Sequence, residues 1–146
     1  MRAKTTKGND WEALSAAARR VSKRAYAPHS GLHVGAALLG RKGGIFAGCN
    51  VENASLGLTI CAEQSALFRA IAEGEREFAA LAIYTPDREP LSPCGACRQV
   101  LAEFAPDLCI LSVGRGGKRV GFHLRELLPH AFDLPPRPLD EQENAS

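Results

Sequence analysis

The sequence predicts an α/β domain in which helices cover both faces of one sheet. Stretches with apolar residues at helical spacing alternate along the chain with short apolar runs of strand length. The order is helix, hairpin, helix, strand, helix, strand and a small end piece, which is typical of layered α/β domains. The 146 residues of the chain are enough for one such domain with a stable core.

The first part of the chain supplies one helix and a hairpin. The helix is predicted over residues 9–27, with Asn9 or Asp10 as its cap, because apolar side chains recur there at helical spacing. A proline and a glycine break the chain after it. Two apolar runs, residues 32–40 and 43–51, flank a turn that contains glycine, and they predict a hairpin.

The second part alternates helices and strands. A helix is predicted over residues 61–75, where a glycine marks its end, and a strand of the buried type follows at residues 78–85. The next helix covers residues 94–105 and is stopped by a proline, and another strand covers residues 108–113. Residues 119–129 predict a last short strand and a helical turn.

Composition limits the kind of protein. We expect one domain over residues 1–133 and a mobile tail over residues 134–146, which is rich in proline and then polar. The net charge of +2, with acids and bases interspersed, gives no concentrated basic face for nucleic acid. No stretch approaches the roughly 20 apolar residues that span a bilayer, and no apolar run follows the charged N-terminus. We therefore expect a cytoplasmic protein that acts on a small molecule, with neither a nucleic-acid nor a membrane partner.

Cysteine opens both of the later helices. Cys61 begins one, while Cys94 and Cys97, three residues apart on one helix face, begin the other. Helix starts often gather at one edge of an α/β sheet, and a helix N-terminus stabilises a thiolate, so the three sulfurs can converge. Three protein ligands with an open fourth position are typical of catalytic zinc, and four of structural zinc. Cys49 and Cys109 lie in strand runs, where we expect small buried residues.

Glu63 follows Cys61 by two residues, in the first turn of the same helix. A carboxylate there has a structural explanation, since it interacts favourably with the helix dipole. A catalytic explanation is also open, because zinc lowers the pKa of a water that it binds and a nearby carboxylate can carry that proton. Cys94 and Cys97 alone also suit a redox pair, which needs neither Cys61 nor Glu63.

Four segments in order, "APHSGLHVGAALL", "GCNVENAS", "CAEQSALFRAIAEGE" and "SPCGACRQVLAEF", resemble the short zinc-dependent cytidine deaminases of pyrimidine salvage. Their C-x-E and P-C-x-x-C elements have the pattern of zinc deaminases. The resemblance runs over about residues 26–132 and implies a three-layer α/β/α sandwich with a mixed five-stranded sheet. It also implies a homotetramer with shared active sites. The site would hold one Zn²⁺ per chain on Cys61, Cys94 and Cys97, with Glu63 as proton shuttle.

The resemblance further implies a nucleoside substrate and the residues that contact it. Asn50 and Glu52 would hold the ribose hydroxyls, which suits an amide that donates and a carboxylate that accepts. The structural alternative for both is a polar loop after a strand. Leu32 and Ala62 would lie against the nucleoside. Phe132 matches an aromatic residue that one subunit sends toward the base in another, and its alternative is a hydrophobic anchor for the C-terminal turn.

Three residues depart from the family pattern. Leu32 stands in place of a phenylalanine and Leu56 in place of a frequent tyrosine, so the pocket is less aromatic. A deaminase of a modified cytosine nucleoside, such as blasticidin S, is therefore the alternative to an enzyme for cytidine and 2′-deoxycytidine. Gln64 stands in place of an arginine, and we expect Arg98 or the helix dipoles to offset the thiolate charge instead. A polynucleotide editor would need aromatic and basic segments, and a structural zinc protein would need a fourth ligand and no Glu63.

Overall fold

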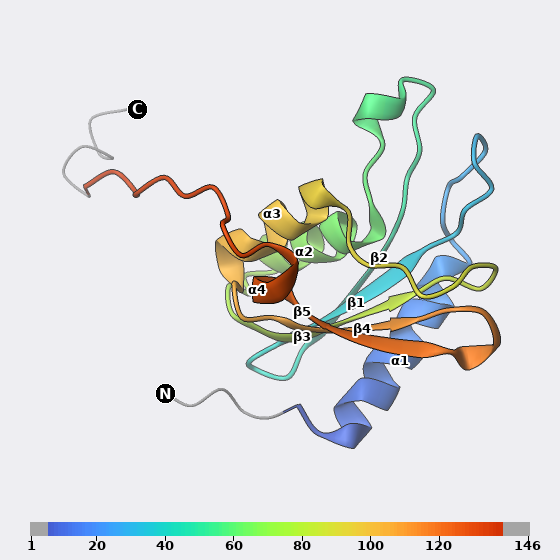
Figure 1. Ribbon diagram of the computed structural model, residues 1–146, viewed down its shortest axis with the longest axis horizontal. Helices are drawn as coiled ribbons and strands as arrows, with labels where there is room; N and C mark the ends of the chain where they lie inside the picture. Colours follow the sequence, from blue (N-terminus) through green and yellow to red (C-terminus); the bar gives the residue numbers. More distant parts are fainter. Residues whose placement is uncertain (1–5, 139–146) are drawn as a thin grey trace.

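The computed structural model describes residues 6–138 and contains one mixed five-stranded sheet in the order β2–β1–β3–β4–β5 (Figure 1). Strands β3 and β4 are parallel, and the other neighbouring pairs are antiparallel. The strand bounds are Gly35–Gly40 for β1, Ile45–Cys49 for β2, Phe78–Tyr84 for β3, Cys109–Val113 for β4 and Arg119–His123 for β5.

Helices lie on both faces of this sheet, as predicted. Helix α1 (Gly8–Ser22) packs on one face against β1, β2 and β3, while α2 (Ala62–Ala72) and α3 (Gly95–Phe104) lie on the other (Figure 1). The short elements are α4 (Leu124–Leu127) and the 3-10 turns η1 (Leu56–Leu58) and η2 (Arg115–Gly117). Within residues 6–138, none of these helices combines the length and the apolar character that crossing a membrane requires.

Two apolar clusters hold the layers together, one on each side of the sheet. Leu67 of α2, Leu81 of β3 and Leu101 of α3 belong to the larger cluster. Leu14 of α1 and Ala82 of β3 belong to the smaller one. Neighbouring strand residues alternate between the two clusters because successive side chains of a strand point to opposite faces.

Two glycines let the helices approach the sheet closely. A Cβ atom on Gly35 would lie 1.9 Å from the carbonyl oxygen of Ala18 in α1, and one on Gly48 would lie 2.3 Å from the backbone nitrogen of Ala66 in α2. Both contacts are with backbone, which cannot rotate away. The position of α2, and of the residues at its start, therefore depends on the missing side chain of Gly48.

The predicted first helix has the wrong limits. It is preceded by Lys7, not capped by Asn9 or Asp10, and the carboxylate of Asp10 accepts a hydrogen bond from the Lys7 backbone N–H at 3.1 Å. It ends at Ser22 because the backbone near residue 26 has other partners. The N–H of Tyr26 donates to the carbonyl of Asn50, and the N–H of residue 52 donates back to Tyr26.

Cys109 is not the buried apolar residue that the sequence led us to expect. It begins β4 and is only half-buried, and its Sγ lies 3.4 Å from Nε2 of His123, the directly opposite residue on β5. Cys49 at the end of β2 is also half-buried. The proposed tail stays a prediction, since residues 134–138 form neither helix nor strand and residues 139–146 lie outside the described part.

Candidate active site

Two helix starts bring three cysteines together. Cys61 immediately precedes α2, Cys94 immediately precedes α3, and Cys97 lies in the first turn of α3. The Sγ atom of Cys94 lies 3.8 Å from that of Cys61 and 3.4 Å from that of Cys97. All three sulfurs lie within 4.8 Å of one another, which confirms the convergence expected from the sequence.

The geometry of this cluster fits zinc. With Zn–S bonds of about 2.3 Å and tetrahedral angles, ligand sulfurs lie about 3.8 Å apart, close to the separations found here. Cys97 is fully buried and Cys94 is exposed, so the cluster is accessible from one side. Within residues 6–138 no histidine, carboxylate or further cysteine joins the group. Three thiolates with an open fourth position are typical of a catalytic metal site.

Neighbouring thiols change each other's pKa. A hydrogen bond with the Cys97 thiol lowers the pKa of Cys61 to about 7. The same interaction raises the pKa of Cys97, and burial raises it further. Because zinc binds the thiolate form, the lowered pKa of Cys61 favours metal binding near neutral pH.

Glu63 lies in the first turn of α2 and is 6% exposed. Burial raises the pKa of its carboxyl group, while a hydrogen bond with the Cys97 thiol acts in the opposite direction. A carboxylate that serves only the helix dipole would gain nothing from such burial, since desolvation disfavours its charge. A buried carboxyl beside a ligand cysteine therefore favours the catalytic explanation for Glu63.

Gln64 also hydrogen-bonds a thiol of the cluster. Its Nε2 donates to the Sγ of Cys97 at 3.5 Å. The guanidinium of Arg98 donates instead to the carbonyl oxygens of Pro93 at 2.8 Å and Leu127 at 3.0 Å. Arg98 thus fixes the segment that leads into Cys94, whereas Gln64 acts on the sulfur itself.

Asn50 links the end of β2 to the loop before β1. Its Oδ1 accepts from the N–H of Val34, and its Nδ2 donates to the carbonyl of Leu32, both at 2.8 Å. The residue is 7% exposed. These two bonds leave one N–H and one acceptor position of the carboxamide for a ligand. Asn50 therefore holds the backbone of Leu32 and Val34 and keeps one N–H and one acceptor position for a ligand.

Glu52 is held by the loop between α1 and β1. Its Oε1 accepts from the backbone N–H groups of His29 at 2.9 Å and Ser30 at 3.1 Å, and its Oε2 accepts from the Ser30 hydroxyl at 2.5 Å. The Ser30 hydroxyl, and then the backbone donors, lower the pKa of this carboxylate. The role of Ser30 could not be predicted from the sequence, because "PHSG" has the composition of an ordinary turn.

The segment with these polar residues lies beside the metal cluster. Val51 and Ile60 exchange backbone hydrogen bonds at 2.9 and 3.0 Å, and Ile60 directly precedes Cys61. Leu32 is partly buried against the larger core cluster. The side chain of Ala62 is fully buried in the same cluster, so only its backbone is available to a ligand.

Phe132 does not anchor the C-terminal turn within its own chain. Its side chain is 74% exposed. Gln99 of α3 holds the Phe132 backbone instead, donating to its carbonyl at 2.9 Å and accepting from its N–H at 3.1 Å. Leu56, in the η1 turn, is similarly exposed. Both residues are therefore largely open to solvent in the single chain.

The fold and the cluster define an α/β/α enzyme domain with a three-cysteine zinc site. Residues 9–113 match the family model for the cytidine and deoxycytidylate deaminase zinc-binding region. This match covers well over half of the chain. The protein therefore belongs to the cytidine and deoxycytidylate deaminase family.

Individual relatives agree with this membership. The chain is 44% identical over 124 residues to a cytidine deaminase of Halalkalibacterium halodurans, covering 84% of this chain and 94% of the relative. The crystal structure of cytidine deaminase from Burkholderia pseudomallei is similar with a TM-score of 0.79 and 47% identity, covering 83% of this chain and 98% of that one. A blasticidin-S deaminase of Bacillus cereus is less similar, at 34% identity over 105 residues, which cover 66% of this chain and 74% of the relative.

Proposed function

We infer that the protein catalyses the zinc-dependent hydrolytic deamination of cytidine and 2′-deoxycytidine, giving uridine and 2′-deoxyuridine and releasing ammonia. The observation that carries this function is the three-cysteine cluster with the buried carboxyl of Glu63 beside it. The relatives named cytidine deaminase supply the substrate class.

In the mechanism, Cys61, Cys94 and Cys97 hold the zinc, which when bound makes water a nucleophile near neutral pH. We assign proton transfer to Glu63. Its carboxylate takes the proton of the attacking water and gives it to the ring nitrogen N3 of the cytosine. The water oxygen forms a bond to ring carbon C4. Glu63 then takes the remaining proton from that oxygen and gives it to the amino group, so the C4–N bond breaks, the C4 carbonyl forms and ammonia leaves. A raised pKa suits this residue because it must both accept and donate a proton within one cycle.

For substrate binding we propose that the Glu52 carboxylate and the remaining N–H of the Asn50 carboxamide bind the ribose hydroxyls. The carboxylate of Glu52 can accept from a hydroxyl, and the remaining N–H of Asn50 can donate to one. Leu32 and the backbone of Ala62 would line the base side. Blasticidin S stays the alternative substrate, and the lower similarity to its deaminase favours ordinary cytosine nucleosides.

We also propose a homotetramer with shared active sites, in the cytoplasm. Support for the assembly comes from exposed apolar side chains in the segment that leads to Cys61, which are Val51, Leu56, Leu58 and Ile60, and from the exposed Phe132. Exposed apolar side chains that gather in this way usually mark a protein interface. Five free cysteines are consistent with a reducing compartment.

The test of this function is chromatography of the reaction products. Purified zinc-loaded protein is incubated separately with cytidine, 2′-deoxycytidine and blasticidin S, and the native mass is measured on the same sample. We expect conversion of both nucleosides to their uridine forms. Conversion of blasticidin S alone would overturn the assigned substrate, and a monomeric mass with full activity would overturn the shared sites.

A further inference from the structure

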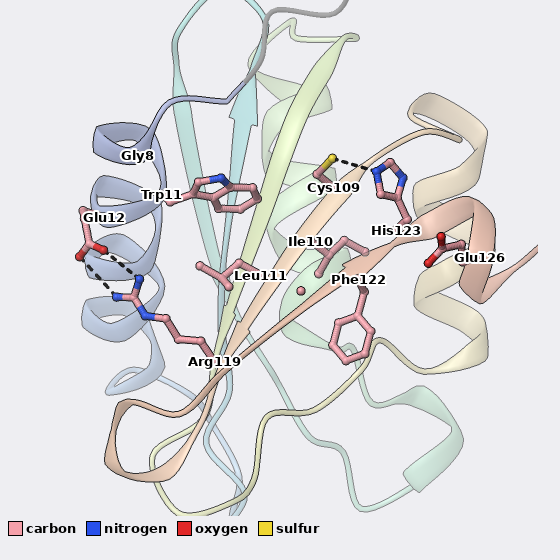
Figure 2. A pocket seen from close by; sticks show the side chains of 11 residues that line it. Gly8, Trp11, Glu12, Cys109, Ile110, Leu111, Arg119, Phe122, His123 and Glu126 are labelled. Atoms are coloured by element: carbon pink, nitrogen blue, oxygen red, sulfur yellow. Dashed lines mark hydrogen bonds and ion pairs between the residues drawn. The ribbon is translucent and has the colours of Figure 1, made fainter.

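The sheet face that carries α1 is open over β4 and β5. Helix α1 packs on β1, β2 and β3. Beside it a groove with a cavity volume of about 540 Å³ follows the last two strands (Figure 2). Trp11 and Leu111 give it an apolar surface, and Gly121, opposite Leu111, contributes no side chain that would fill it. This groove has space for a ligand that the deamination reaction does not use.

Two polar pairs lie at separate places along the groove (Figure 2). In one, the Sγ of Cys109 lies 3.4 Å from the Nε2 of His123 on the neighbouring strand. In the other, Nη1 of Arg119 lies 2.9 Å from the Glu12 carboxylate. An imidazole that close to a thiol can accept its proton, and the thiolate is the nucleophilic form of cysteine.

The other cysteines lack this arrangement. Cys61, Cys94 and Cys97 are the zinc ligands, and bound metal occupies their sulfurs. Cys49 is half-buried like Cys109, but among the residues that the structure describes its thiol has no hydrogen-bond partner. Cys109 is therefore the thiol of the zinc-loaded protein that combines access, a basic partner and a groove.

We propose that Cys109 is a thiolation site and that the groove takes a small peptide disulfide, with oxidised glutathione as the probe. The Cys109 sulfur, its proton passed to His123, attacks one sulfur of the disulfide. A new S–S bond to Cys109 forms as the old S–S bond breaks. The released half departs as a thiolate and takes the proton from His123. The disulfide is the oxidant, so the step needs no other reactant.

The spacing of the two pairs supports a peptide. Arg119 is opposite Val113, four residues along β4 from Cys109, so its backbone lies about 13 Å away at about 3.3 Å per residue. An extended peptide of about three or four residues spans that length. Glu12 accepts from two of the five guanidinium N–H groups of Arg119, which leaves donors for a peptide carboxylate.

The reaction leaves the deaminase site unaffected. Cys109 lies opposite Ala80 near the start of β3, whereas the chain reaches Cys94 from the end of β3. The two sites therefore lie toward opposite ends of strand β3. An adduct on Cys109 is expected to leave zinc content and deamination unchanged.

The experiment treats the zinc-loaded protein with oxidised glutathione and follows the intact mass and the modified peptide. We expect one adduct, on Cys109, that Cys109→Ser abolishes and the matched Cys49→Ser leaves unchanged. His123→Gln should slow the reaction at least about fivefold, because the thiol loses the neighbouring imidazole that takes its proton during the attack. Arg119→Ala should slow the reaction with oxidised glutathione but not with the neutral hydroxyethyl disulfide.

Three results would overturn the proposal. They are an adduct on Cys49 at the same rate, adducts that appear only as zinc is lost, and an unchanged rate in a folded His123→Gln protein. Equal effects of Arg119→Ala on both disulfides would overturn the role of the groove. Thermal unfolding of each variant shows that it is folded.

Discussion

The hydroxyl of Ser30 donates to the Oε2 of Glu52 at 2.5 Å, while the backbone N–H of the same serine donates to Oε1. One residue of the loop before β1 thus fixes both oxygens of the carboxylate that we assign to the ribose. The hydroxyl also accepts from the Leu32 N–H at 3.0 Å. Ser30 is therefore a positioning residue that links the sugar side of the site to Leu32.

Ser30→Ala should weaken nucleoside binding with little change in kcat. Loss of a hydrogen bond to a carboxylate predicts a rise in KM of about tenfold, equivalent to about 1.4 kcal/mol. Steady-state kinetics with cytidine and 3′-deoxycytidine measure it, and the variant should discriminate less between the two. Ser30→Thr, which keeps the hydroxyl, should retain most of the affinity. An unchanged KM would show that Glu52 needs no support from this residue.

The melting temperature of the protein should change with pH in the acid range because of Glu52. Its pKa is lowered from the usual 4.5, first by the Ser30 hydroxyl and then by backbone donors. The folded state therefore favours the ionised form. Stability from these bonds is present above about pH 4.5 and is lost as the pH falls through the lowered pKa. The melting temperatures of wild type and Glu52→Gln should differ at neutral pH and converge in acid. A constant difference across this range would contradict the prediction.

Gly48→Ala should displace α2 and disturb the metal site. The new Cβ would lie 2.3 Å from the Ala66 nitrogen, so helix and strand must separate. We expect a loss of about 1–3 kcal/mol in the free energy of unfolding, the usual cost of overpacking. Zinc per chain should fall as well, because Cys61 precedes the same helix. Gly8→Ala is the control, since a Cβ there meets no atom within 4 Å. Equal stability of the two variants would contradict the close approach.

Gln64→Leu should weaken zinc binding without unfolding the protein. The hydrogen bond from Nε2 to the Cys97 sulfur is lost, and loss of such supporting contacts lowers metal affinity by about tenfold or more. Competition with a chromophoric chelator measures the affinity. Gln99→Leu is the matched control, because Gln99 on α3 bonds the Phe132 backbone and not a thiol. Equal zinc affinities in the two variants would show that the Gln64 hydrogen bond does not contribute to zinc binding.

The layered fold and the metal cluster followed from sequence because each depends on local signals. Helical and strand periodicity predicted the order of elements, and cysteines at two helix starts predicted the convergence of Cys61, Cys94 and Cys97. The mixed five-stranded sheet was implied only by the resemblance, and the strand order with its single parallel pair is known from the structure alone. The alternation of apolar residues within a strand does not depend on which other strand it pairs with, so the alternation cannot predict the pairing.

Contacts between loops that are distant in the sequence could not be predicted. The first helix ends five residues early because the Tyr26 backbone pairs with residues 50 and 52, and nothing near Tyr26 indicates this. The roles of Ser30 and Gln99 cannot be predicted for the same reason, since each side chain hydrogen-bonds a residue far along the chain. The sequence predicts Cys109 to be a core residue, because its partner His123 lies on another strand and nothing near Cys109 indicates the contact.

The most direct test of the central claim compares Glu63→Gln with wild type, with zinc per chain and cytidine turnover measured on the same samples. We predict about one zinc on each protein, the stoichiometry of a three-cysteine site. Turnover by the variant should fall by about 10²–10⁴-fold, the usual contribution of a proton-transferring residue. Zinc loss or unfolding in Glu63→Gln would give this residue a structural role, and unchanged turnover would contradict its place in the reaction.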